Sequence, residues 1–315
     1  MRLVFMGTPD FASASLEALL RSNDSVVGVV TQPDRPKGRG QLLTASPVKL
    51  LAQRAQIPLL QPLKMKDPEF LHALAGWSPD LIAVAAFGRI LPPAILSLPP
   101  RGCINVHGSL LPKYRGAGPI QWAIVNGETE TGITTMLMDE GMDTGAMLLQ
   151  EALPITPDDT AGTLSPRLAA LGGRLLVETI ARLKAGTLVP RPQDSSRATL
   201  APLLKKEDGA IDWALPATAL ANRVRGLSPW PGAHIRMAGG DRWTIWRALA
   251  LPGPVTEPPG VIVAITNEAI HVATGDGILA VMELQPANSR RMAVSQYLAG
   301  HPVAVGARLG GPVLS

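Results

Sequence analysis

Short apolar runs that resemble strands alternate with helix-like segments along the first half of the chain. The strands are predicted at residues 2–6, 26–31 and 81–86, and the first two helices at 9–21 and 47–56. Thr8 is suited to cap the first of these helices, with Pro9 in its first turn. The run at 81–86 is apolar without a break, which is typical of a strand buried on both faces. The alternation therefore predicts a mainly parallel sheet covered by helices.

The pattern changes near residue 190. Strands at 103–107 and 132–138 and a helix at 163–184 complete the first pattern, and a polar, proline-bearing connection follows at 190–206. One more helix, at 217–225, and several short alternating runs with turn signals come after it. We expect an α/β chain with a Rossmann-like N-terminal domain (1–189), a linker (190–206) and a smaller, OB-like β-barrel as the C-terminal domain (207–315).

Composition excludes several classes of protein. Hydrophobic residues make up 46% of the 315 positions and charged residues 17%, so the chain can bury a core and is not disordered. Its longest apolar stretch, 81–88, is far shorter than the roughly 20 residues of a membrane helix, and the apolar run after Arg2 is too short for a signal peptide, so we expect a cytoplasmic location. Cys103 has no second cysteine to pair with, and the five histidines are dispersed, so no bound metal is expected.

The positive charge is unevenly distributed. The formal net charge is +4, and residues 1–189 carry 17 basic and 16 acidic side chains, whereas 190–315 carry 12 and 9. Such an excess indicates a polyanionic partner. Residues 31–40, TQPDRPKGRG, form a predicted basic loop, which could bind phosphate or simply be solvated.

The segment with the most chemical information is INVHGSLLP, residues 104–112. Asn105 and His107 lie two positions apart in a predicted strand, so they project from the same face, about 6.6 Å apart along the chain, as two hydrogen-bond donors. The alternative is a polar strand end whose histidine bonds a nearby carbonyl. Residues 138–145, MDEGMDTG, form an acidic loop whose glycines permit tight turns, and its alternative is a solvated surface turn.

Three common phosphate-binding or nucleophile motifs are missing from the sequence. It contains neither G-x-G-x-x-G nor G-x-x-x-x-G-K-[ST], so a dinucleotide or nucleoside triphosphate site lacks its phosphate cradle. Ser109 lies near His107, but no G-x-S-x-G elbow exposes a nucleophilic serine, which argues against a serine hydrolase.

In combination, these segments resemble the formyltransferase family that uses 10-formyltetrahydrofolate, in particular its members that act on methionyl-tRNA. The matching motifs are VFMGTPDFA (4–12), TQPDRPKGRG (31–40), SPVK (46–49), FGRILP (87–92), NVHGSLLPKYRGAGP (105–119), MDEGMDTG (138–145), DGAIDW (208–213), SPWPGA (228–233) and RRM with LAGH (290–301). They cover nearly the whole chain. The resemblance implies transfer of the formyl group of 10-formyltetrahydrofolate to the free α-amino group of methionyl-initiator tRNA, for translation initiation.

The resemblance implies that Asn105, His107 and Asp143 are catalytic. A free α-amino group, with a pKa of about 7.7–8.0, needs little activation. The main task is therefore to stabilise the negative charge that develops on the formyl oxygen. Asn105 and His107 would donate hydrogen bonds to that oxygen. Asp143 would orient protonated His107, and whether it also accepts the proton of the amine stays open.

The resemblance also implies two sets of binding residues. Folate would contact Phe87, Gly88, Arg89, Ile90, Leu91, Ser109, Leu110, Leu111 and Pro112, where apolar side chains beside backbone amides suit a pterin, although core packing would also explain the leucines. The tRNA would contact Arg35, Lys37 and Arg39 in the basic loop, with Arg39 on the acceptor stem, and Lys205, Lys206, Arg223, Arg225, Arg290 and Arg291 on the barrel, unless these are only a solvated basic surface.

Two other functions stay open. A sugar-amine N-formyltransferase would have the same fold and catalytic residues and a nucleotide-linked amino sugar as its acceptor. A non-catalytic RNA-binding module could retain the fold without the reaction. The basic loop and the basic C-terminal domain favour tRNA, and the intact set of Asn105, His107 and Asp143 argues against a non-catalytic module. The oligomeric state is open, with a monomer favoured.

Overall fold

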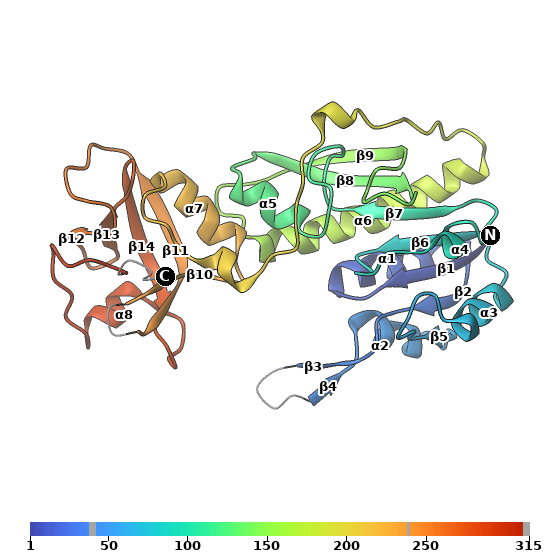
Figure 1. Cartoon of the computed structure of the whole chain (residues 1–315), viewed down its shortest axis with the longest axis horizontal. Helices are drawn as coiled ribbons and strands as arrows, with labels where there is room; N and C mark the ends of the chain where they lie inside the picture. The colour runs from blue at the N-terminus through green and yellow to red at the C-terminus, as the bar shows by residue number, and fades with distance from the viewer. Residues whose placement is uncertain (38–41, 238–239, 311–315) are drawn as a thin grey trace. The chain divides into compact units, whose positions relative to one another are not determined.

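A computed structural model of the chain describes residues 1–37, 42–237 and 240–310 (Figure 1). The chain divides into two units. Residues 1–119, 130–154 and 165–202 form unit 1, and residues 120–129, 155–164 and 203–315 form unit 2. The segments 120–129 and 155–164, which the sequence places in the N-terminal domain, thus pack with the C-terminal residues. The predicted linker is also divided, because residues up to 202 pack with unit 1.

Unit 1 is built on one seven-stranded sheet. In spatial order its strands are β5 (Leu59–Leu60), β2 (Ser25–Val30), β1 (Arg2–Gly7), β6 (Leu81–Ala85), β7 (Cys103–His107), β8 (Glu130–Leu137) and β9 (Met147–Pro154). The first five are parallel, and β8 and β9 are antiparallel to their neighbours. β6 is buried along its whole length, as its unbroken apolar run predicted. The antiparallel edge, including all of β9, was not predicted.

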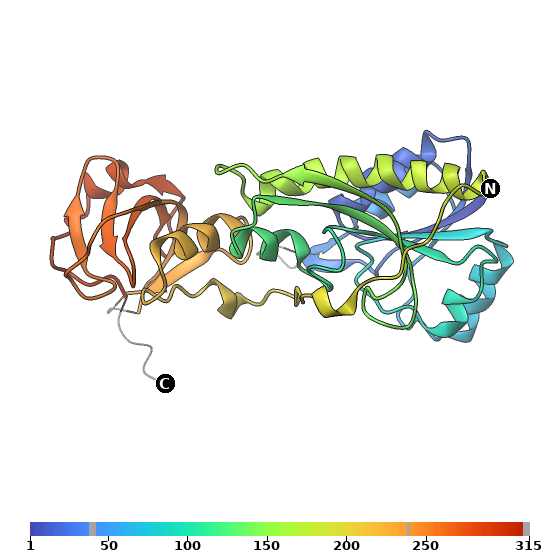
Figure 2. The same ribbon diagram turned by 90° about the horizontal axis from the view of Figure 1, so that it is seen from above.

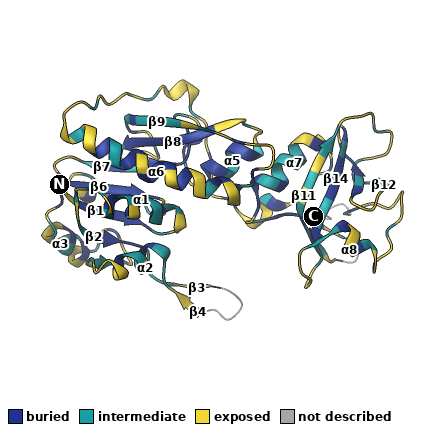
Figure 3. Ribbon diagram, turned by 180° about the vertical axis from the view of Figure 1, so that it is seen from behind, coloured by how far each residue is buried: buried dark blue, intermediate teal, exposed yellow. Residues whose placement is uncertain are grey.

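Helices cover both faces of this sheet (Figure 2). They are α1 (Asp10–Leu20), α2 (Pro47–Arg54), α3 (Pro68–Gly76), α4 (Pro93–Leu96) and the long α6 (Ala161–Lys184). α6 lies close to α1 because Gly173 has no side chain, and a Cβ there would meet the Ala14 carbonyl oxygen at 2.8 Å. On the opposite face, Phe70 and Leu74 of α3 pack with Ile82 of β6 in one apolar cluster. Figure 3 shows the buried strands beneath the exposed outer sides of the helices.

Two local predictions differ from the structure. The helix α1 begins at Asp10 with Pro9 as its N-cap, and Thr8 does not cap it. The prediction for Thr8 was wrong because its hydroxyl donates to the Phe87 carbonyl instead, at 3.2 Å. Part of the predicted basic loop (31–40) forms the strand β3 (Arg35–Lys37), which pairs with β4 (Leu42–Thr44) in a hairpin. Residues 38–41, which include Arg39, lie outside the described residues.

Unit 2 contains an antiparallel sheet of six strands. These are β10 (Ala233–Arg236), β11 (Arg242–Leu251), β14 (Ile278–Gln285), β13 (Ile270–Ala273) and β12 (Ile262–Ile265) in spatial order, with β15 (Met292–Ala293) paired to β14. The helices α7 (Ala217–Gly226) and α8 (Val294–Leu298) pack on it, and α5 (Pro119–Val125) runs from the end of unit 1 into unit 2. Trp213, Trp243 and Tyr297 lie in its core. A helix-covered, mainly parallel sheet followed by a small antiparallel, barrel-like sheet confirms the predicted fold class. Among the residues described, no helix is long and apolar enough to cross a membrane.

Candidate active site

The end of β7 holds the two polar residues that the sequence singled out. Asn105 and His107 project from the same face of the strand, and the carboxyl end of β7 is where ligands of α/β sheets bind. His107 is only 4% exposed. Its Nε2 lies 2.8 Å from the Tyr114 carbonyl oxygen, and its Nδ1 lies 3.6 Å from Oδ2 of Asp143. Both ring nitrogens therefore face protein oxygens.

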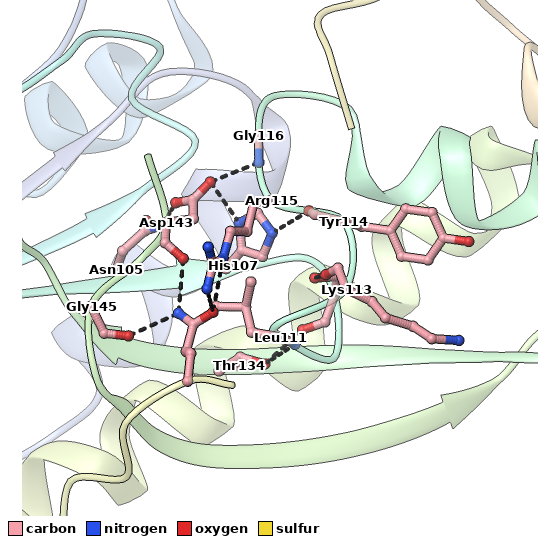
Figure 4. Close-up of polar contacts among 12 residues, drawn as sticks. Asn105, His107, Leu111, Lys113, Tyr114, Arg115, Gly116, Thr134, Asp143 and Gly145 are labelled. Atoms are coloured by element: carbon pink, nitrogen blue, oxygen red, sulfur yellow. Dashed lines mark hydrogen bonds and ion pairs between the residues drawn. The ribbon is translucent and has the colours of Figure 1, made fainter. Parts of the chain in front are cut away.

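Asp143 joins these residues from the loop between β8 and β9 (Figure 4). Its Oδ1 accepts a hydrogen bond from Asn105 Nδ2 at 3.3 Å, and its Oδ2 accepts one from the Gly116 amide at 2.9 Å. Its side chain is 17% exposed. The structure thus brings together Asn105, His107 and Asp143, although 38 positions separate Asn105 from Asp143.

The surroundings of the imidazole restrict its hydrogen bonding. Both neighbours, the Tyr114 carbonyl and the Asp143 carboxylate, can only accept. A proton on Nε2 is donated to the Tyr114 carbonyl at 2.8 Å, whereas the 3.6 Å between Nδ1 and Asp143 Oδ2 is longer than a hydrogen bond. An imidazolium at this place would therefore meet Asp143 as an ion pair, not as a hydrogen-bond partner.

Glycine fixes the shape of the loop that carries Asp143. The Asp139 carboxylate accepts hydrogen bonds from the Gly141 amide at 3.1 Å and from the Thr144 hydroxyl at 2.7 Å. A Cβ at Gly145 would lie 1.8 Å from the Leu137 carbonyl oxygen, so only glycine fits there. Asp143 itself has a φ of 54°, in the left-handed region that non-glycine residues seldom occupy.

The predicted folate segment 109–112 follows β7 directly, and side chains of β8 and β9 bind its main chain. The Thr134 hydroxyl donates to the Ser109 carbonyl at 2.7 Å and accepts from the Leu111 amide at 3.1 Å. Gln150 Nε2 donates to the Leu111 carbonyl at 2.8 Å. The Ser109 hydroxyl is used internally, because it donates to the Lys113 carbonyl at 2.6 Å. Leu110 and Pro112 are half-buried, and Leu111 is buried.

The second predicted folate segment, 87–91, alternates between core and surface. Phe87 and Leu91 are buried, Gly88 is exposed, Arg89 is half-buried, and Ile90 is 87% exposed. Gln32 Nε2 donates to the Phe87 carbonyl at 2.7 Å and reaches the Gly88 carbonyl at 3.3 Å. An exposed isoleucine beside a fixed main chain gives this segment an apolar surface for a ligand.

A pocket of about 470 Å³ opens beside this segment, at the carboxyl ends of β1 and β2. Its lining comes from four parts of the chain: Thr8, Pro9, Asp10, Gln32, Pro33, Arg35, Pro36, Thr44, Ala45, Ser46, Pro47 and Ala86. The Arg35 guanidinium donates to Gln32 Oε1 at 2.6 Å. A guanidinium among proline rings and hydroxyls can receive a ligand that is partly anionic and partly apolar.

The base of the β3–β4 hairpin is anchored by charge. Lys49 Nζ lies 2.6 Å from the Asp34 carboxylate, and Gln61 Nε2 donates to the same carboxylate at 2.8 Å. The hydrogen bond from Lys49 lowers the pKa of Asp34, as does that from Gln61. This contact joins the TQPD and SPVK motifs, since Asp34 supplies the carboxylate and Lys49 the ammonium.

The predicted tRNA contacts fall into two groups. Arg35, Lys205, Lys206 and Arg290 are exposed. Arg225 is half-buried and donates to the carbonyls of Thr156 and Asp159, at 3.2 Å each, and burial lowers its pKa.

The remaining basic residues of the barrel also have partners inside the molecule. The Arg223 guanidinium donates to the Asp208 carbonyl, and Arg291 pairs with Glu283 and lies over the Trp246 ring. These contacts occupy donors that a phosphate would need.

Several residues that complete the site were not predicted. Tyr114 and Gly116 contact His107 and Asp143 through their main chains, and Arg115 lies between them. They follow SLLP in the same motif, so their position was a usable signal. Gln193 donates to the carbonyls of Asp143 and Gly145, at 2.8 Å each, from the predicted linker. A single glutamine in a proline-bearing connection gives no such signal.

Comparison with known families and proteins gives consistent matches. The family model described as Formyl transferase matches residues 1–180, and that described as Formyl transferase, C-terminal domain matches residues 203–302. A methionyl-tRNA formyltransferase of Trichlorobacter lovleyi is 53% identical over 308 residues, which is 98% of this chain and 96% of the relative.

Solved structures share the fold at low identity. An N-formyltransferase of Helicobacter canadensis, in complex with folinic acid and dTDP-3-aminofucose, has a TM-score of 0.66 at 19% identity and covers 92% of this chain and 99% of its own. HypX of Aquifex aeolicus, in complex with tetrahydrofolic acid, has a TM-score of 0.60 at 18% identity and covers 95% of this chain and 47% of its own.

Proposed function

Because this chain belongs to the formyl transferase family, we propose that it is a methionyl-tRNA formyltransferase. It transfers the formyl group of 10-formyltetrahydrofolate to the α-amino group of methionyl-initiator tRNA. The proposed active site rests on one observation: Asn105, His107 and Asp143 lie in contact at the carboxyl end of β7. We also propose a cytoplasmic location, because initiator tRNA is used by the translation machinery there.

The three residues have complementary roles in this proposal. Bound 10-formyltetrahydrofolate supplies the formyl group, and the amine of the acceptor forms the new carbon–nitrogen bond. Asn105 has a second amide hydrogen beyond the one given to Asp143, and this hydrogen can be donated to the formyl oxygen as it gains negative charge. His107 in its imidazolium form adds positive charge at the same place, and its ring can donate to that oxygen in exchange for the Tyr114 carbonyl.

Asp143 serves the other two residues. Its carboxylate balances the imidazolium, orients the Asn105 amide, and is fixed by the Gly116 amide. It is also the partly exposed carboxylate of the set, so it can accept the proton that the amine loses, directly or through water.

The two predicted folate segments fit a pterin with a benzoyl tail. Segment 109–112 has its main chain fixed by Thr134 and Gln150, and segment 87–91 presents the exposed Ile90. Fixed backbone groups suit the hydrogen-bonding edge of a pterin, and apolar side chains suit its aromatic face. Ser109 acts here through the chain fold, because its hydroxyl is bound to Lys113.

For the tRNA, the hairpin and the first residues of unit 2 are the main candidates. Arg35, Lys205 and Lys206 are exposed, and Lys37 and Arg39 follow Arg35 in the basic sequence 31–40. Arg223 and Arg225 have guanidinium donors bound to main-chain carbonyls, so we expect a smaller contribution from them. Binding through lysine and arginine weakens steeply as salt rises.

An acceptor assay tests the proposed function. The chain is given labelled formylfolate with methionyl-initiator tRNA, methionyl-elongator tRNA or a nucleotide-linked amino sugar. We expect label on the initiator tRNA. Label on the amino sugar would identify a sugar N-formyltransferase, and label on no acceptor would show a chain that has lost catalysis.

Variants test the roles of the three residues. We expect Asn105→Ala, His107→Asn and Asp143→Ala each to lower kcat by roughly 10²- to 10³-fold, because each removes charge stabilisation at the formyl oxygen. His72 is an exposed histidine of α3, and His72→Asn is the matched control with unchanged kcat. A near-normal kcat in His107→Asn would remove His107 from the mechanism.

A further inference from the structure

Gln193 has all its polar side-chain groups bound at the catalytic loop. Its Nε2 donates to the carbonyls of Asp143 and Gly145, at 2.8 Å each. Its Oε1 accepts from Arg115, at 3.0 Å from Nε and 2.8 Å from Nη2. One side chain thus connects the loop that carries Asp143 to the loop that follows SLLP.

Arg115 lies in the loop that contacts the other side of the catalytic set. It is 8% exposed, and its amide donates to the Thr199 carbonyl at 2.8 Å. The Ala201 amide donates back to the Arg115 carbonyl at 2.7 Å. Its neighbours in sequence supply the carbonyl that faces His107 and the amide that binds Asp143. Residues 193–201 therefore bind both the main chain and the side chain of Arg115 and so fix the loop that follows SLLP.

The catalytic loop needs such support. Asp143 has a φ of 54°, a conformation that persists in a non-glycine residue only when the surroundings determine it. Gln193 binds the carbonyls of residues 143 and 145, on either side of Thr144, so it fixes the turn in which that conformation occurs. Without these bonds the turn loses two of its anchors, and the Asp143 carboxylate, which lies 3.6 Å from His107 Nδ1, is held, among the described residues, only by the Gly116 amide and Asn105.

We propose that Gln193 is a positioning residue for formyl transfer: it fixes the Asp143 carboxylate against His107 by binding the main chain of 143–145 and by tying that loop to Arg115. This role rests on the proposed function, since it assigns Gln193 to the same reaction. It also gives the predicted linker a part in catalysis, in addition to connecting two domains.

Two variants separate the donors of Gln193 from its acceptor. Gln193→Glu retains an oxygen that accepts from Arg115. It replaces the amide nitrogen, which donates to the carbonyls of Asp143 and Gly145, with a second oxygen that cannot donate to them. Gln193→Met removes all polar contacts at similar volume. We expect each to lower kcat by about 10- to 100-fold, the usual effect of losing a group that orients a catalytic residue. We expect KM for formylfolate and for methionyl-tRNA to change less than about threefold, because Gln193 contacts neither substrate in this proposal.

A double-mutant cycle with Asp143 provides the readout that a general structural role would not affect. In the Asp143→Asn background, Gln193→Met should lower kcat less than about twofold further, because the carboxylate that Gln193 positions is already lost. The matched control is Gln53→Met, at an exposed glutamine of α2, which should leave kcat unchanged in both backgrounds.

The results that would overturn the role of Gln193 differ from those that would overturn the proposed function. Unchanged kcat in both Gln193 variants, multiplicative losses in the cycle, or a loss of kcat that only follows a lower Tm would overturn the role of Gln193. A wild-type chain that formylates no methionyl-tRNA would overturn the proposed function, and this role with it. An active wild type with unaffected variants would overturn the role of Gln193 alone.

Discussion

At the scale of single residues, the site depends on its glycines as much as on its charged groups. A Cβ at Gly141 would lie 2.0 Å from the Thr144 hydroxyl oxygen, and one at Gly116 would lie 2.6 Å from the Ala201 carbonyl oxygen. Gly116 also has a φ of 121°. Gly141 leaves room for the Thr144 side chain, and Gly116 lets its main chain approach that of Ala201, so the D-x-G-x-DTG and RG motifs also meet packing requirements.

Gly145→Ala tests this packing. The added Cβ would lie 1.8 Å from the Leu137 carbonyl oxygen, so the loop must move. We expect the free energy of unfolding to fall by about 2–4 kcal/mol and kcat to fall with it, because Asp143 shifts. Chemical denaturation and steady-state kinetics measure the two effects.

Gly76→Ala is the matched control for this variant. Gly76 is the last residue of α3, and a Cβ there meets nothing within 4 Å. It should leave kcat unchanged and raise stability by at most about 1 kcal/mol, since alanine favours helix over glycine. A stable, active Gly145→Ala chain would show that the loop tolerates the displacement.

At the scale of elements, the end of the long helix α6 is fixed to the β1–β2 side of unit 1 by charge. Lys184, its last residue, has its Nζ 2.8 Å from the Asp24 carboxylate. Burial raises the pKa of Asp24, but the hydrogen bonds from Lys184 and the N-terminal amine outweigh it, and the pKa is lowered from its ordinary value. Asp24 is 6% exposed and Lys184 is 38% exposed, so the pair is shielded from solvent on the carboxylate side only.

Lys184→Met should therefore lower the free energy of unfolding by about 1 kcal/mol at pH 7. An acid whose folded-state pKa is lowered contributes stability above its unfolded pKa of about 3.9, and that contribution is lost as the pH falls through the folded-state value. The difference between wild type and variant should therefore shrink below about pH 4.

The control for Lys184→Met is an exposed ion pair on α1. Arg21 is 80% exposed and pairs with Glu17 at 3.3 Å, so Arg21→Met should change stability by less than about 0.5 kcal/mol at any pH. Urea unfolding at several pH values measures both variants. An effect of Lys184→Met that does not shrink as the pH falls from 7 into the acid range would contradict the assignment to Asp24.

At the scale of the whole molecule, the two units are interleaved in sequence. Unit 2 includes 120–129 and 155–164, which lie between segments of unit 1 in the chain. Gly226 of α7 packs where a Cβ would meet Val125 at 2.7 Å, and Arg225 binds the carbonyls of Thr156 and Asp159. These contacts explain why a boundary placed by composition alone divides unit 2.

A chain that ends at Pro202 tests this organisation. It retains 120–129 and 155–164 but removes the residues that cover them, so we expect exposed apolar surface and loss of a single cooperative unfolding transition. Dye binding and thermal unfolding, compared with the full chain, measure both. A fragment 1–202 that unfolds cooperatively without binding the dye would show that unit 1 is independent of these contacts.

The sequence by itself determined the class of fold and named the residues that we propose for the reaction. Strand runs such as 81–86 and the Asn105-x-His107 pair follow from local periodicity, since a strand sends alternate side chains to one face whatever surrounds it. The motifs that resemble a family then identified Asp143, which local patterns alone left as a residue of an acidic turn.

Only the tertiary structure decided how those groups are held. The Gly116 amide and Gln193 reach Asp143 from segments 27 and 50 positions away in sequence. The Tyr114 carbonyl reaches His107 from seven positions away, where the loop after SLLP turns back. The bonds from Arg223 and Arg225 to main-chain carbonyls likewise form only where folding brings those carbonyls next to the guanidinium groups. No periodicity encodes such contacts, because hydrogen bonds between distant loops depend on where packing places each main chain.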